Sequence, residues 1–145
     1  MQIFNYKIVN NSPALLGFIA LCSIVLVLDT ILSGKVVNSM FSVYRSSFTD
    51  PLTYFRLFGH VAGHSNFSHY FGNITSLLIT GPMLEEKYGS KGLIQIILLV
   101  AFVTGLLNFI FFPRVSLRGA SGVVFAFIVL ASITGSQKGT IPVTL

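Results

Sequence analysis

The 145-residue sequence has no tryptophan, a single cysteine and few charged residues. Because a disulfide needs two thiols, Cys22 cannot form one within the chain and is expected to be a small core residue. Only 9% of the residues are charged, and the nine lysines and arginines are scattered along the chain. A nucleic-acid-binding surface needs clustered basic residues, so nucleic acid is excluded as a partner.

Long apolar stretches are abundant instead, with 53% hydrophobic residues and a mean hydropathy of +0.83. Uncharged or nearly uncharged runs predict four membrane-spanning helices, at about 13–32, 70–84, 92–112 and 119–137. The first run is too long for a signal peptide, and Ser12 with Pro13 is typical of a helix start. We therefore expect an all-α membrane protein, with residues 1–145 forming one transmembrane domain.

Two polar segments interrupt these runs. Residues 34–68 mix lysine and arginine with many aromatic side chains, which predicts a loop lying partly in the membrane interface. The motif "LEEKYGSK", residues 84–91, predicts a charged turn between the second and third spans. Basic residues are divided almost evenly between the two sides of the membrane, so they do not determine the orientation of the chain.

Three histidines, His60, His64 and His69, precede Asn73 at the start of the second span. His69 and Asn73 are four residues apart and would share one helix face, where they could form interhelical hydrogen bonds. A metal-binding or transport bundle using the three histidines is an alternative, which predicts bound metal in the purified protein. The sequence contains no HExxH motif and no carboxylate near the histidines, so we expect no metal site.

The fourth span begins with "GASG", in which Ser121 has two possible roles. Small residues let membrane helices pack closely, so the serine could be a packing residue. It could instead be a nucleophile, which requires a base for its proton and hydrogen-bond donors for the oxyanion. His69 and Asn73 are candidate donors.

Taken together, these motifs resemble the rhomboid intramembrane serine proteases. The resemblance rests on "GASG", on "HYFGN" (His69–Asn73) and on "GPMLEEKYG" (Gly81–Gly89). The segments "FR" (Phe55–Arg56) and "HVAGH" (His60–His64) resemble the first long loop of that family. The resemblance runs from about residue 52 to the end of the chain.

The resemblance implies a rhomboid-like polytopic helical bundle, with four of an expected six transmembrane helices present. Ser121 would be the nucleophile, and His69 and Asn73 would form the oxyanion hole with the Ser121 backbone amide. No cofactor or metal is implied. Further matched positions would form a structural network: Arg56, His64, Glu85, Gly119 and Gly122. Arg56 and Glu85 would hold the first loop in place.

The sequence also departs from the family. Phe55 replaces the usual tryptophan, and Phe125 replaces the usual tyrosine one turn after the serine. The family's general base is a histidine on the sixth helix, whereas all three histidines here precede Ser121. The resemblance therefore implies the amino-terminal part of a protease, without its last two helices and inactive alone.

The implied function is intramembrane serine endopeptidase, hydrolysing peptide bonds in or near transmembrane helices of membrane-protein substrates. The alternative is a non-catalytic rhomboid-like protein that binds transmembrane helices. The implied partners are a substrate transmembrane helix and the lipid bilayer. A multi-pass protein of the bacterial cell membrane is expected, with its amino terminus in the cytoplasm.

Overall fold

The computed structural model describes residues 12–136, and this part of the chain is helical with short connections. Residue 137 of the predicted fourth span, and the amino terminus predicted to be cytoplasmic, lie outside the described residues. The elements in chain order are α1 (Pro13–Ile31), α2 (Lys35–Ser39), α3 (Pro51–Gly59), the short 3₁₀ helix η1 (His60–Ala62), α4 (Phe67–Phe111) and α5 (Ser121–Ser136). Residues 12–136 contain no strand, only an isolated antiparallel bridge between Val43 and Leu117.

Helix α1 begins and ends close to the predicted positions. Ser12 is at the N-cap and Pro13 at the first helical position, where its missing N–H costs nothing. Its 19 residues span roughly 28 Å, close to the thickness of a bilayer's hydrocarbon core. Large apolar side chains such as Ile24, Val27 and Ile31 are exposed on its surface, as is typical of a helix in contact with lipid.

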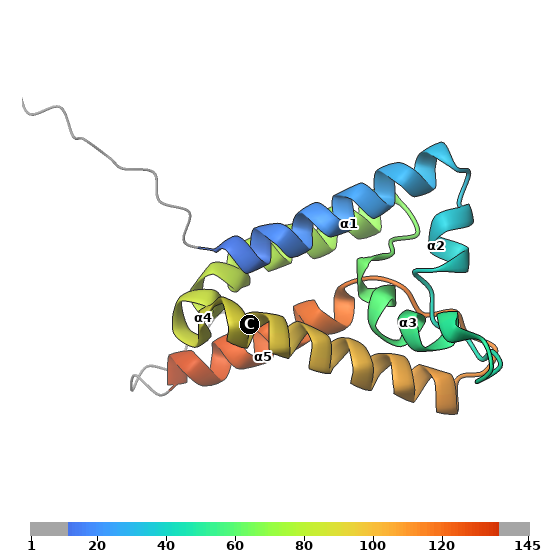
Figure 1. Cartoon of the computed structure of the whole chain (residues 1–145). Helices are drawn as coiled ribbons and strands as arrows, with labels where there is room; N and C mark the ends of the chain where they lie inside the picture. The colour runs from blue at the N-terminus through green and yellow to red at the C-terminus, as the bar shows by residue number, and fades with distance from the viewer. Residues whose placement is uncertain (1–11, 137–145) are drawn as a thin grey trace, which may run out of the picture.

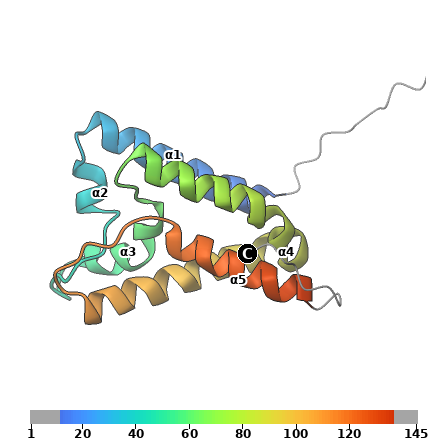
Figure 2. The same cartoon turned by 180° about the vertical axis from the view of Figure 1, so that it is seen from behind.

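The charged turn predicted at residues 84–91 coincides with a sharp kink in α4, whose 45 residues are two helices joined within that stretch. Only Gly89 departs from helical geometry, with φ of 72° and ψ of 165°. Glycine adopts a positive φ without steric cost, so this one residue can change the direction of the helix. The two parts of α4 on either side of it run in different directions (Figures 1 and 2).

Helices α1 and α4 are long and apolar enough to cross a membrane, and the apolar part of α5, Ser121–Ile133, is shorter. At 45 residues, α4 has about twice the length that one crossing needs. The described residues therefore form a helical membrane fold. Four separate crossings remain a prediction.

The packing places the start of α5 beside the start of α4. Helix α1 lies along the first part of α4 in both views, and α5 packs against α4 (Figures 1 and 2). The first loop contributes α3 and η1, which also contact α4. The largest cluster of buried apolar side chains includes residues from α1, α4 and α5, among them Leu15, Leu77, Leu93, Val123 and Phe127.

Candidate active site

Ser121 is the first residue of α5, and its side chain is exposed. The Val124 N–H donates to the Ala120 carbonyl, so the hydrogen-bonded turns of the helix start at Ala120. The first N–H groups of a helix have no acceptor within it, and the helix dipole makes this end attractive to negative charge. The Ser121 backbone N–H is therefore a donor suited to an oxyanion.

His69 lies against the backbone just before this serine. A β-carbon added to Gly119 would be 2.5 Å from His69 Cε1 and 2.8 Å from Nε2. Gly119 also has a φ of 114°, which other residues rarely adopt. Glycine is therefore needed here for both the conformation and the space. The His69 imidazole packs against Gly119, which precedes Ser121 by two residues in the chain.

The segment before Ser121 is held by the first loop. The Gly119 N–H donates to the His60 carbonyl over 2.9 Å, and Val43 and Leu117 exchange two backbone hydrogen bonds of 2.9 Å. Gly122 contributes close packing against α4, since an added β-carbon would be 3.2 Å from Thr104 Cγ2. The first turn of α5 is thus fixed from two sides.

Asn73, one turn after His69, is buried and bonded to His64. Its Nδ2 atom lies 3.1 Å from His64 Nε2, and His64 Nδ1 lies 3.2 Å from the Ala62 carbonyl oxygen. Burial lowers the pKa of His64 to about 4, so its imidazole is neutral near pH 7. Burial also lowers the pKa of His60 to about 4.

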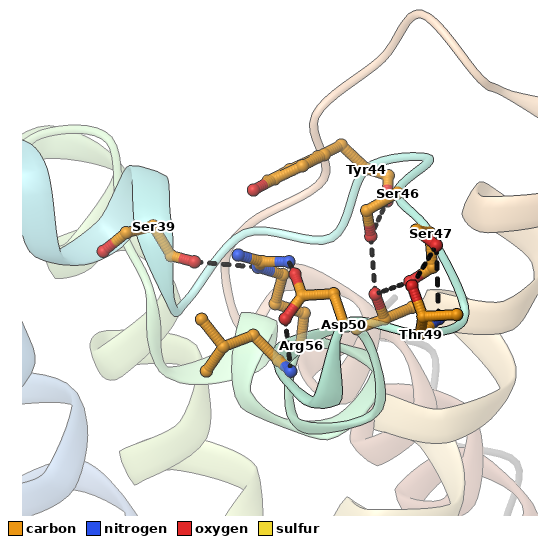
Figure 3. Close-up of polar contacts among 9 residues, drawn as sticks. Ser39, Tyr44, Ser46, Ser47, Thr49, Asp50 and Arg56 are labelled. Carbon is orange, nitrogen blue, oxygen red and sulfur yellow. Dashed lines mark hydrogen bonds and ion pairs between the residues drawn. The ribbon is translucent and has the colours of Figure 1, made fainter.

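Arg56 connects three parts of the first loop (Figure 3). Its Nε donates to the Ser39 carbonyl over 2.8 Å, and its Nη1 forms a 2.9 Å ion pair with Asp50 Oδ2. The guanidinium also lies over the Tyr44 ring, 4.7 Å from the centroid. Asp50 in turn caps α3 by accepting the Leu52 N–H. These contacts agree with the predicted role of Arg56 in holding the loop.

The Arg56–Asp50 contact predicts an acid-sensitive loop. The Leu52 N–H and the Arg56 side chain hold the pKa of the Asp50 carboxyl below its usual range. The stabilisation is therefore present above the unfolded pKa of about 4 and is lost as the pH falls through the lower folded value. Hydrogen-exchange protection at Leu52 and Thr53, corrected for intrinsic rates, should fall severalfold between pH 5 and pH 3. Asp50→Asn keeps a capping side chain but should lose this pH dependence, and an unchanged dependence would contradict the assignment.

Glu85 is buried, but the prediction that it holds the first loop is wrong. Its carboxylate accepts the N–H groups of Ala14 (2.8 Å) and Leu15 (2.9 Å), in the first turn of α1. It also accepts the Ser90 hydroxyl over 2.6 Å. The physical reason is that the amino end of a helix has unsatisfied donors and a partial positive charge, which a carboxylate stabilises.

Sequence reasoning missed Asn108, whose side chain links the first loop to the connection between α4 and α5. Its Nδ2 donates to the Val43 carbonyl (3.2 Å) and to the Val115 carbonyl (3.0 Å). A polar amide within the otherwise apolar stretch 92–112 was the available signal, because such a group needs partners in a membrane.

The positions of the three histidines do not support the alternative of a metal site. Across residues 12–136, no three His, Cys, Asp or Glu side chains gather as metal ligands. Both ring nitrogens of His60 and of His64 face protein groups, which are Arg56 and Thr104 for His60 and Ala62 and Asn73 for His64.

The apolar helices and the polar groups gathered where α4 and α5 begin define an integral membrane protein with a polar site. A comparison with protein-family models matches residues 51–141 to the Rhomboid domain, which is more than half of the chain. The chain therefore belongs to the rhomboid family. Members of this family are in general intramembrane serine proteases that act on membrane-protein substrates in the bilayer. A comparison with curated proteins gave no match.

Proposed function

We propose that this chain carries the nucleophile and the oxyanion hole of an intramembrane serine endopeptidase. The observation that supports the proposal most is the contact of the His69 imidazole with the Gly119 backbone, two residues before the exposed Ser121. A buried Asn73 lies one helical turn from His69. In this proposal the nucleophile comes from the start of α5, and the two side-chain donors come from the start of α4.

In the proposed reaction, Ser121 Oγ attacks the carbonyl carbon of a peptide bond in or near a substrate's transmembrane helix. The carbonyl oxygen becomes negative and accepts hydrogen bonds from the Ser121 backbone N–H, His69 and Asn73. His69 Nδ1 lies 3.3 Å from Ser65 Oγ, which leaves Nε2 for the oxyanion. The serine proton passes to a general base, which returns it to the leaving amine.

None of the three histidines in these 145 residues is assigned the role of the base, because each serves another role in this proposal. His69 is assigned to the oxyanion, and the ring nitrogens of His60 and His64 face protein groups. In the proposed topology α1, the two parts of α4, and α5 each cross the bilayer of a bacterial cell, and the amino terminus is cytoplasmic.

The proposal is tested by Asn73→Ala in the full-length protein that contains these residues. Removing one oxyanion donor should lower kcat by about 10²-fold and leave KM nearly unchanged, because the contact strengthens only in the transition state. Cleavage of a transmembrane substrate in proteoliposomes measures both constants. Thr75→Ala, at an exposed position on the same helix, is the control. Full activity of Asn73→Ala would exclude Asn73 from the oxyanion hole.

A further inference from the structure

The hydrogen-bond chain from Ala62 to Asn73 fixes the position of every proton along it. A carbonyl oxygen can only accept, so the 3.2 Å contact with Ala62 requires the proton of His64 on Nδ1. The ring is neutral, so Nε2 carries no proton and can only accept. Asn73 must then present its amide nitrogen to His64 at 3.1 Å, not its oxygen.

We propose that His64 is a positioning residue for the reaction, which orients the Asn73 amide so that its second N–H can donate to the oxyanion. The inference rests on the proposed function. If the Asn73 amide were rotated by 180°, its oxygen would face the bare Nε2 atom, and two acceptors would repel each other. The imidazole therefore selects one of the two amide orientations.

Burial makes this selection strict. His64 is 1% exposed and Asn73 is 7% exposed, so water cannot easily replace either partner. The His64 ring also contacts the Tyr70 ring, with centroids 5.4 Å apart, and Tyr70 is bonded to Ser23 of α1. The imidazole is thus held by its neighbours and does not depend on Asn73 for its own orientation.

The kinetic test uses four variants of the full-length protein in proteoliposomes: His64→Phe, His64→Gln, Asn73→Ala and the double variant His64→Phe with Asn73→Ala. His64→Phe keeps a ring without an acceptor, so kcat should fall about 10-fold with KM unchanged, less than the roughly 10²-fold loss for Asn73→Ala. His64→Gln offers an amide oxygen as acceptor and should restore most of the activity. The double variant should be no slower than Asn73→Ala, whereas additive losses would overturn the proposal.

The spectroscopic test does not depend on catalysis. Nitrogen-15 NMR of the wild-type protein in lipid should show a neutral His64 with its proton on Nδ1, and His64→Phe should shift the Asn73 side-chain amide signals. A proton on Nε2, or unshifted Asn73 signals, would overturn the inference. If the wild-type protein cleaves no substrate, the proposed function fails, and the spectra alone then decide whether His64 orients Asn73.

Discussion

Replacing Ser121 with alanine in the full-length protein is expected to lower substrate cleavage by about 10⁴-fold or more, because the covalent step needs its hydroxyl. The oxyanion donors remain in this variant, so a small residual rate is expected. Cleavage of a transmembrane substrate in proteoliposomes measures the loss. Ser116→Ala is a matched control, because Ser116 is also exposed and lies in the connection just before α5. An equally active Ser121→Ala protein would exclude the proposed mechanism.

The 145 residues alone are expected to cleave nothing, since they contain no histidine after Ser121 that could act as the base. Without a base the serine hydroxyl remains a poor nucleophile. Serine-dependent cleavage by the 145 residues would contradict this and assign the base to one of the existing histidines. A full-length protein that binds transmembrane helices but cleaves none would favour the non-catalytic alternative.

Replacing Glu85 with alanine is expected to lower the free energy of unfolding by about 2–4 kcal/mol. The partly buried N–H group of Ala14 and the buried N–H group of Leu15 would lose their acceptor. The Ser12 side chain makes no cap hydrogen bond at this helix end. A charge-assisted hydrogen bond contributes more than a neutral one, so Glu85→Gln should lie between wild type and Glu85→Ala.

Glu86→Ala is the control for this measurement, because Glu86 is the neighbouring carboxylate and is exposed. Exposed substitutions usually change stability by no more than about 0.5 kcal/mol. Unfolding of the three variants in a mixed-micelle denaturant titration gives the comparison. Equal losses for Glu85→Ala and Glu86→Ala would contradict a capping role for Glu85.

Local sequence signals predicted where the helices lie better than they predicted the contacts and kinks between them. The start of α1 was predictable because Ser12 and Pro13 directly precede an apolar run. The charged residues 84–91 predicted a break between two helices, but not that the break is confined to Gly89 with helix on both sides of it. Periodicity does not indicate that Glu85 faces inward toward a helix end more than seventy residues earlier in the chain.

The same limit applies to the site. The four-residue spacing of His69 and Asn73 predicted one shared helix face, and α4 does begin ahead of both residues. The contact of His69 with Gly119 depends on how α4 and α5 pack, which local spacing does not encode. The order of donors and acceptors from Ala62 to Asn73 likewise required coordinates, since a sequence does not specify a tautomer.

The capping of α1 by Glu85 also bears on where the protein could be shortened. The family match starts at residue 51, which leaves α1 outside it, yet the carboxylate that caps α1 belongs to the matched region. A protein trimmed at residue 51 would keep a buried carboxylate while losing two of its donors, and would expose the apolar surface that α1 covers. We therefore expect a stable form of this protein to include α1, which lies outside the residues matched to the family.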